Sequence, residues 1–295
     1  MRRPTLIQKE ALAGFGYVLP ALLGIALFAV IPFVIIIIFS FSSAGIGAFR
    51  WNGITNYRSL LLSPAFRLAL ENTGKFMLIG IPIVVGFAMI LALLLHSMEL
   101  RNSRAYALLF ALNLCPMVMP SGSIMLFFRV MFERYGILNS LLHATDKMPV
   151  DWLHGDITFW ILLLVYVWKS YGYCMIILLS GLKNCDVSMH EAAALDGAGT
   201  VRRFFALTLP DLKPLLQFSA VLSTINVFAT YRESFLLLGN YPTESAYMLP
   251  NFLMNSFQSF NFPQMYSATT LFLGLSALVT AGSFLSTKRK KRRNS

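Results

Sequence analysis

The sequence predicts an all-α membrane protein with six transmembrane helices. Of its 295 residues, 57% are hydrophobic and only 13% are charged, whereas about a quarter of the residues in a soluble domain are charged. The apolar residues come in blocks of about 20, the length a helix needs to cross a hydrocarbon core roughly 30 Å thick. Because backbone hydrogen bonds must close within each segment inside lipid, these blocks are expected to be helices.

The first predicted span covers about residues 17–41 and follows a short basic start with Arg2, Arg3 and Lys9. A cleaved signal peptide would begin in the same way. The apolar core is too long for a signal peptide, however, and no convincing small-residue cleavage site follows it. Five further apolar blocks come later in the chain. The first block is therefore expected to remain as an uncleaved span.

The remaining predicted spans cover about residues 76–95, 105–130, 158–182, 212–238 and 264–286. An even number of spans puts both termini on one side of the membrane. Fifteen Lys and Arg residues lie on that side and seven on the other, and six of the fifteen form the run 288–293. The positive-inside rule then places both termini in the cytoplasm. The run directly follows a span and has no interleaved aromatics, which favours contact with anionic lipid over binding of nucleic acid.

A short helix is predicted in the loop between the fourth and fifth spans, residues 183–213. Ser188 precedes Glu191 by three residues, which is the spacing of a capping box, and good helix formers follow. Gly197 and Gly199 permit the backbone conformations that would stop this helix. Its alanines would leave a thin surface that the groove of another protein could approach closely.

The same loop carries a longer pattern, and most of the chain carries weaker landmarks. The pattern reads Glu191-Ala192-Ala193, Asp196-Gly197-Ala198, Phe204 and Leu209-Pro210. The landmarks are Gly53–Tyr57, Glu71–Thr73, Cys115–Pro120 and Trp168–Tyr173. A Glu-Ala-Ala tripeptide alone would indicate only a capped turn. The full pattern resembles the EAA loop of binding-protein-dependent ABC permeases, and most closely that of their carbohydrate branch.

The resemblance implies a type I ABC importer permease fold (MetI-like) in a bacterial inner membrane. In that family the loop's short helix sits in a cleft of a cytoplasmic ATPase dimer, which uses ATP and Mg, and transmits its closure to the spans. The implied partners also include a second, homologous permease subunit and an external solute-binding protein. The residues implied in ATPase coupling are Glu191, Ala192, Ala193, Asp196, Gly197, Leu209 and Pro210. The expected domains are a cytoplasmic N-terminus (1–16), a permease domain (17–286) containing the loop, and a basic tail (287–295).

Two polar stripes within the spans are candidates for a solute pathway, because polar residues are costly in lipid. In the fourth span, Tyr166, Lys169, Ser170 and Tyr173 fall at i, i+3, i+4 and i+7 on one helical face. In the fifth span, the stripe consists of Ser219, Ser223, Asn226, Thr230 and Glu233. Helix–helix contact within a bundle is the competing explanation. Together the stripes offer hydrogen-bonding groups and aromatic faces, which suit a sugar or an oligosaccharide.

The residues expected to line the pathway are Tyr166, Lys169, Ser170, Tyr173, Ser223 and Asn226. Resemblance to maltose-transporter-type subunits implies solute contacts at Tyr173 and Asn226. Those subunits carry an asparagine near Tyr166 and a glycine at Ser170, which leaves room for a different solute here. Arg232 and Glu233 lie near the outer end of the fifth span, where a structural ion pair competes with a pathway role. Pro116 and Pro120 in the third span could loosen that helix and expose carbonyls to a cavity, but a static kink is the commoner outcome, so they are assigned no site.

The sequence contains no phosphate-binding loop, no dinucleotide fingerprint and no histidine or cysteine spacing typical of a metal site. No catalytic constellation stands out, so a transport subunit without enzymatic activity or a bound cofactor is expected. Two alternatives remain open. One is an ABC permease for another small solute, such as a glycerol phosphodiester or a polyamine; the other is an ion-coupled secondary carrier.

Overall fold

A computed structural model describes residues 6–43, 49–99 and 102–291 of the chain. Side chains are described within 14–43, 49–99 and 102–277, so most of the basic residues expected at the two termini, and Arg101, lie outside the described part. Within it the regular elements are helices, and one isolated bridge joins Ser42 and Trp51. The chain divides into two compact units, residues 64–252 with 279–295, and residues 1–63 with 253–278.

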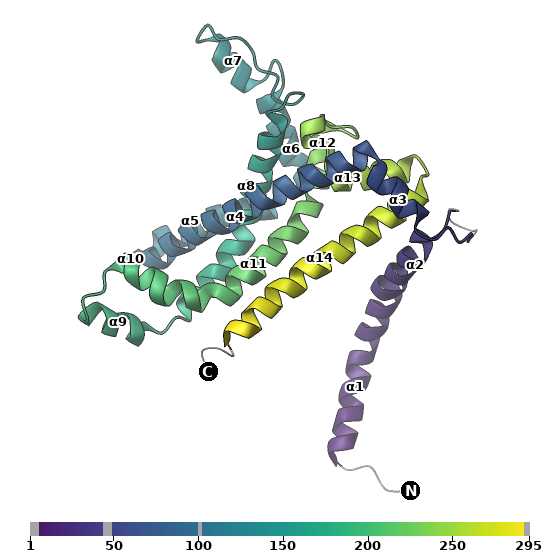
Figure 1. Cartoon of the computed structure of the whole chain (residues 1–295). Coiled ribbons are helices and arrows are strands. Elements are labelled where there is room, and N and C mark those ends of the chain that lie inside the picture. The colour runs from purple at the N-terminus through teal and green to yellow at the C-terminus, as the bar shows by residue number, and fades with distance from the viewer. Residues whose placement is uncertain (1–5, 44–48, 100–101, 292–295) are drawn as a thin grey trace. The chain divides into compact units, whose positions relative to one another are not determined.

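The larger unit holds most of the helices (Figure 1). In chain order they are α4 (Pro64–Glu99), α5 (Ser103–Val118), α6 (Ser121–Phe132), α7 (Ile137–His143), α8 (Thr158–Lys183), α9 (Val187–Leu195), α10 (Thr200–Arg203), the π-helical turn η2 (Phe204–Thr208), α11 (Leu209–Ala229), α12 (Tyr231–Leu238), the 3-10 turn η3 (Glu244–Ala246) and the start of α13 (Leu249–Gln258). The central helix is α8, which packs most extensively on α4 and then on α11 and α5.

Small residues let the helices around α8 approach closely. A Cβ on Gly80 of α4 would come within 3.0 Å of the Leu163 and Tyr166 side chains of α8. Gly181 of α8 lies even closer to two leucines of α11. Close backbone approach at small residues is typical of helix packing in membranes, where lipid provides no hydrophobic force between helices. The core that results is fully closed around Tyr166, which is 2% exposed.

The smaller unit contains α1 (Leu6–Ile25), the π-helical turn η1 (Ala26–Val30), α2 (Ile31–Ser40), α3 (Thr55–Leu62), and the part of α14 (Phe262–Lys291) up to residue 278. Its helices are tied by side-chain hydrogen bonds to the end of α2. The Asn56 amide donates to the carbonyls of Ser40 and Ser42 at 2.9 and 2.7 Å. The Ser267 hydroxyl donates to the same Ser40 carbonyl at 3.2 Å.

Four described helical stretches are long and apolar enough to span a membrane, namely Gly14–Ser40, Pro64–Glu99, Thr158–Lys183 and Thr200–Leu238. They overlap the predicted spans at 17–41, 76–95, 158–182 and 212–238. A fifth stretch counts only if the bent pair Ser103–Val118 and Ser121–His143 forms one span. Helix α14 covers the predicted span at 264–286, but its side chains beyond 277 lie outside the described residues. The fold class is therefore all-α and membrane-spanning, while the count of six stays a prediction.

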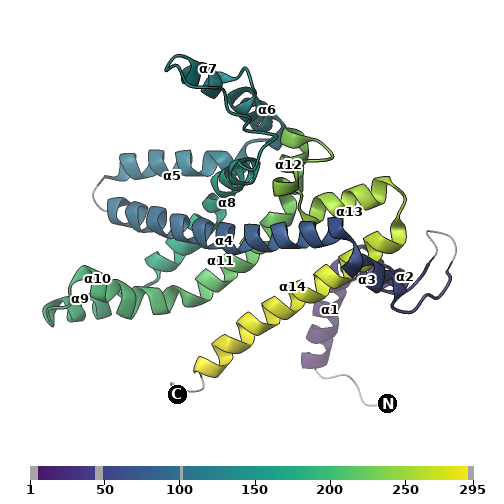
Figure 2. The same ribbon diagram turned by 45° about the horizontal axis from the view of Figure 1, so that its top comes forward.

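The predicted continuous span at 105–130 is wrong in one respect, because the chain breaks there. Helix α5 and the stretch Ser121–His143, which contains α6 and α7, are bent by 92° at this break. Figure 2 shows the change of direction between α5 and α6. Met119 is extended, with φ −64° and ψ 137°, as expected for a residue that precedes a proline. Pro120 then stands at the N-cap of α6. The expected static kink is thus a full break that leaves a short extended segment between two helices.

Candidate functional site

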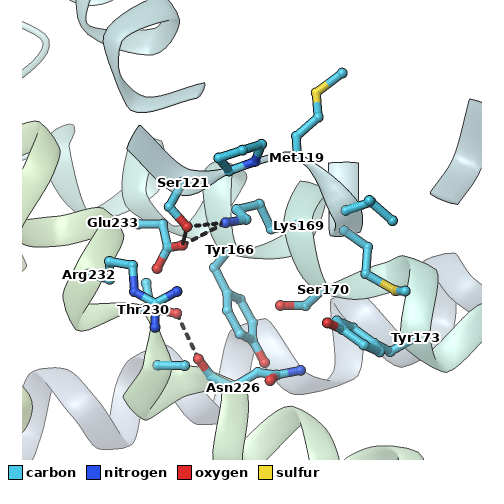
Figure 3. A pocket seen from close by; sticks show the side chains of 14 residues that line it. Met119, Ser121, Tyr166, Lys169, Ser170, Tyr173, Asn226, Thr230, Arg232 and Glu233 are labelled. Atoms are coloured by element: carbon cyan, nitrogen blue, oxygen red, sulfur yellow. Dashed lines mark hydrogen bonds and ion pairs between the residues drawn. The ribbon is translucent and has the colours of Figure 1, made fainter. Parts of the chain in front are cut away.

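The break between α5 and α6 opens onto a cavity of about 360 Å³ in the larger unit (Figure 3). Five helices contribute to it, through their ends or, in α8, through the middle. The lining residues are Met117, Val118, Met119, Pro120, Ser121, Tyr166, Lys169, Ser170, Tyr173, Asn226, Ala229, Thr230, Arg232 and Glu233. Among these, Met117–Pro120 are not predicted as site residues from the sequence, although the two prolines are a signal for a break in the helix.

The predicted face of the fourth span lines the cavity in full. Tyr166, Lys169, Ser170 and Tyr173 all come from α8, and their helical spacing turns them to the same side. From the fifth span only Asn226, Thr230 and Glu233 of the predicted stripe reach the lining. The structure therefore brings the whole of the fourth-span stripe together with the C-terminal part of the fifth-span stripe.

Ser223 does not line the cavity, in contrast to its prediction as a pathway residue. Its side chain is fully buried, and its Oγ lies 3.4 Å from the Cys174 Sγ of α8. Its backbone carbonyl accepts a hydrogen bond of 2.9 Å from the Tyr166 hydroxyl. Ser223 and Tyr166 thus fasten α11 to α8. Tyr166 still borders the cavity, but its hydroxyl is already occupied.

A compact ion-pair network closes one side of the cavity. Lys169 Nζ lies 2.8 Å from Glu233 Oε1 and donates to Ser121 Oγ at 2.5 Å. The Ser121 hydroxyl in turn donates to the same Glu233 oxygen at 2.7 Å. The Lys169 and Glu233 side chains are only 16% and 10% exposed. The network therefore connects α8, α12 and the first residue of α6, directly after the break.

The partner of Glu233 differs from the one that its position in the sequence suggests. Adjacency in the chain makes Arg232 a candidate for an ion pair with Glu233, but Glu233 pairs with Lys169 instead. Consecutive residues on a helix point about 100° apart and do not face each other. Arg232 is exposed in the lining, and its guanidinium makes no hydrogen bond or ion pair with the described residues.

Several polar groups of the lining remain available to a ligand. The Tyr173 side chain is 43% exposed, and Asn226 is half-buried. Neither the Tyr173 hydroxyl nor the Asn226 side-chain amide has a hydrogen-bond partner within the described part of the chain. The Thr230 hydroxyl, by contrast, donates to the Asn226 backbone carbonyl at 2.9 Å. An aromatic face and a free amide together can bind a ring that carries hydroxyl groups.

The second candidate site is the exposed helix α9 of the loop. It begins two residues earlier than predicted, because Asp186 rather than Ser188 is its N-cap. The Asp186 carboxylate accepts from the Ser188 hydroxyl at 2.7 Å and from the Ser188 backbone N–H at 2.9 Å. These hydrogen bonds lower the pKa of Asp186, the hydroxyl contributing most. The predicted helix is present, but the capping box is not what starts it.

Gly197 ends α9 as predicted, in a Schellman arrangement. Its φ of +81° is in the left-handed region, and its N–H donates to the Ala194 carbonyl at 3.1 Å. The next N–H, of Ala198, donates to the Ala193 carbonyl at 2.9 Å. Gly199 has an ordinary negative φ and instead caps α10. Only the first of the two glycines therefore needs a conformation that other residues avoid.

The residues predicted to couple to an ATPase differ in their exposure around α9. Glu191, Ala192, Asp196, Gly197 and Pro210 are exposed, whereas Ala193 and Leu209 are half-buried. Leu209 packs against the hydrophobic core of the larger unit, so it anchors the loop rather than presenting a surface.

The loop surface also displays apolar side chains, with Leu195 90% and Val201 71% exposed. Arg203 links α10 to α9, because its guanidinium donates a hydrogen bond to the His190 carbonyl at 3.3 Å. No group of three or more His, Cys, Asp or Glu that could hold a metal ion occurs among the described residues.

Comparison with known proteins gives the following matches. Residues 84–292 match the family model described as the binding-protein-dependent transport system inner membrane component. The chain is 30% identical over 290 residues to the lactose transport system permease protein LacF of Rhizobium radiobacter, covering 96% of this chain and 95% of that protein. It is 28% identical over 235 residues to the arabinooligosaccharides transport system permease protein AraP of Halalkalibacterium halodurans, covering 79% and 73%.

A solved structure shares the fold. A chain of a bacterial ABC transporter that imports the acidic polysaccharide alginate superimposes with a TM-score of 0.77 at 18% identity, covering 95% of this chain and 96% of that one. At that identity the similarity establishes the architecture, namely that of ABC importer permeases.

Proposed function

Because this chain belongs to the family of binding-protein-dependent transport system inner membrane components, we propose that it is the membrane-spanning permease subunit of an ATP-driven ABC importer for a sugar or oligosaccharide. The observation that supports a sugar as the transported solute is the cavity lined by α5, α6, α8, α11 and α12. There, Tyr173 offers an exposed aromatic face and Asn226 an unoccupied amide. Two relatives similar along most of this chain are named for the transport of lactose and of arabinooligosaccharides.

Transport by alternating access requires that the cavity respond to an event at the cytoplasmic loop. The helix that follows α9 provides a direct connection. From Thr200 to Ala229 the chain is helical throughout, through α10, the π-helical turn and α11. At 1.5 Å per residue, the distance along this helix from Thr200 to Asn226 is roughly 40 Å. A rigid displacement of the loop would therefore move Asn226 and the start of α12.

The proposed partner at the loop is a cytoplasmic ATPase dimer, in which ATP and Mg are used. Glu191, Ala192, Asp196 and Gly197 would face a cleft of that ATPase, next to the exposed Leu195. Exposed apolar side chains at a short capped helix suit a protein interface better than water. Arg203 of α10 donates a hydrogen bond to the His190 carbonyl of α9. A displacement of α9 would therefore also move α10 and the helix α11 that continues from it.

The proposed assembly further contains a second, homologous permease subunit and an external solute-binding protein, because one such chain does not enclose a pathway. The loop must then lie in the cytoplasm. If the six predicted spans are present, both termini lie there too, with domains at 1–16, 17–286 and 287–295. The basic tail would contact anionic lipid and not nucleic acid. The membrane would be the inner membrane of a bacterium.

The proposal is tested by copurification from the native host after gentle solubilisation. The wild-type chain should bring down an ATPase and a second permease, and Gly197→Arg should lose the ATPase while retaining the permease. A bulky residue at φ +81° distorts the end of α9. Thr145→Arg, which adds the same side chain to an exposed turn far along the chain from the loop, is the matched control and should retain both partners.

Uptake completes the test. The copurified complex, reconstituted in proteoliposomes with its binding protein, should accumulate a labelled oligosaccharide only when ATP is enclosed with the ATPase. Accumulation driven by an ion gradient, from a chain that purifies without an ATPase, would establish a secondary carrier instead.

A further inference from the structure

The charge of the cavity lining is concentrated on one residue. Three charged residues line the cavity, Lys169, Arg232 and Glu233, which gives a formal charge of +1 from two cations and one carboxylate. Lys169 and Glu233 neutralise each other at 2.8 Å. The excess positive charge therefore belongs to Arg232, which lies at the α12 end of the cavity (Figure 3).

Glu233 forms no ion pair with Arg232. Its Oε1 accepts from both Lys169 and Ser121, and these hydrogen bonds hold the carboxylate toward α6 and α8. No other acidic side chain lines the cavity among the described residues. Arg232 is thus an exposed guanidinium without an anionic partner, within a stretch that is apolar enough to span a membrane.

An ionised residue in such a stretch is costly unless it faces water or an opposite charge, and it is a functional candidate by default. A guanidinium presents two parallel N–H groups that match the two oxygens of a carboxylate. Within the described part of the chain, the one free cation of the lining suits one carboxylate of the cargo. The nearby Asn226 amide and Tyr173 ring remain suited to hydroxyls and to the apolar face of a sugar ring.

We propose that the cavity is specific for a sugar that bears a carboxylate, a uronate, and that Arg232 is the specificity-determining residue that binds this group. This inference rests on the proposed function and adds a substrate class to it. The Lys169–Glu233 pair plays a separate role, because it keeps Lys169 from competing for the anion. A single carboxylate is therefore selected at one position.

The test measures ligand binding to the purified permease complex in nanodiscs, without the binding protein, so that the cavity alone is assayed. The probes are digalacturonate and galactobiose, which differ in the carboxylates at C6. Wild type should bind digalacturonate about tenfold more tightly, as one charge-assisted contact allows. Because the contact faces a solvent-accessible cavity, raising the salt concentration should reduce this preference.

The variants separate charge from packing. Arg232→Gln should abolish the preference and leave galactobiose affinity unchanged, while Arg232→Lys should retain part of it. Arg129→Gln is the matched control, because Arg129 is an exposed arginine on α6 outside the cavity, paired with Glu133. It should bind both probes as wild type does.

Four results would overturn the proposal. Equal affinity of wild type for the two probes, or no binding of either at millimolar concentration, would exclude a uronate site. Tighter binding of glycerophosphocholine than of digalacturonate would assign Arg232 to a phosphodiester. Loss of the second permease from Arg232→Gln would show that Arg232 pairs with that subunit. In each case the importer function stands if ATPase copurification and ATP-dependent uptake persist.

Discussion

Replacing Glu233 by glutamine tests whether the ion pair beside the cavity holds the helices together. The substitution keeps the shape of the side chain and its ability to accept from Ser121, but removes the charge facing Lys169 at 2.8 Å. Lys169 is 16% exposed, and no other carboxylate lines the cavity among the described residues to replace Glu233 as its partner. A buried charge that loses its partner is destabilising.

The magnitude follows from the distance and the burial. At an effective dielectric constant of about 20, two charges 2.8 Å apart attract by about 6 kcal/mol. The cost of removing both groups from water offsets part of this, and breaking buried pairs costs about 3–5 kcal/mol. Because the hydrogen bond from Ser121 survives, we expect a loss of about 3 kcal/mol. That corresponds to a decrease in Tm of roughly 6–12 °C for a chain of this size.

The assay is thermal unfolding of the detergent-solubilised chain, followed by the fraction that remains monodisperse on size-exclusion chromatography. The control is the double variant Lys169→Met with Glu233→Gln, which removes both charges. Replacing a buried pair by neutral groups is often close to neutral, so the double variant should lie within about 1 kcal/mol of wild type. A double variant more stable than the single Glu233→Gln variant is the signature of the coupling.

The reasoning would be refuted by two joint results. One is a stability of Glu233→Gln within about 0.5 kcal/mol of wild type, the range typical of surface substitutions. The other is additive behaviour of the two single variants. Together they would mean that Lys169 and Glu233 do not interact in the protein.

Three further predictions concern the framework around the two sites. Gly181→Ala should lower the stability by about 1–3 kcal/mol in the same unfolding assay, because the new methyl group would overlap the Leu215 side chain. An unchanged Tm would contradict the close approach of α8 and α11. Asn72→Ala should lower the stability by a similar amount, about 1–3 kcal/mol. The Asn72 amide donates to the carbonyls of Glu244 and Tyr247 at 2.6 and 3.0 Å, and both carbonyls would lose this donor. Asn72→Asp, which removes the donor but keeps the shape of the side chain, should not restore the stability. Lowering the pH through the depressed pKa of Asp186 should reduce the protection factors for amide exchange in α9, taken relative to the unfolded rate at each pH. The cap is fully present above the unfolded pKa near 4 and is lost as the carboxylate takes up a proton. Asp186→Ala should show the reduced protection at every pH.

Much of the architecture could be predicted from local features of the sequence. Apolar segments of sufficient length predicted four of the long helical stretches, because in lipid a helix is the structure that satisfies its own backbone. The helix α9 and its end at Gly197 also follow from local chemistry, in which a residue free to adopt positive φ closes the last turn. The family assignment came from the spacing of residues in the same loop, and the family match confirms it.

The details of the cavity could not be predicted in this way. Helical periodicity correctly placed Tyr166, Lys169, Ser170 and Tyr173 on one face. It could not show that Ser223 turns toward Cys174 and away from the cavity, because that depends on how α11 is rotated against α8. The N-cap of α9 was misplaced for a smaller reason, since Asp186 and Ser188 both suit a cap and only the backbone shows which one accepts the N–H.

What the sequence by itself determined is therefore the class of the protein: helical spans, an exposed loop with a short helix, and polar faces within an apolar chain. What only the tertiary structure decided is which of those polar groups are occupied. Lys169 lies 64 residues from Glu233 and 48 from Ser121 along the chain, yet the three share one hydrogen-bonded network. Arg232, beside Glu233 in sequence, has no partner among the described residues that line the cavity. The physical reason is that periodicity sets the direction of a side chain on its own helix, whereas its partner depends on helices that meet through packing.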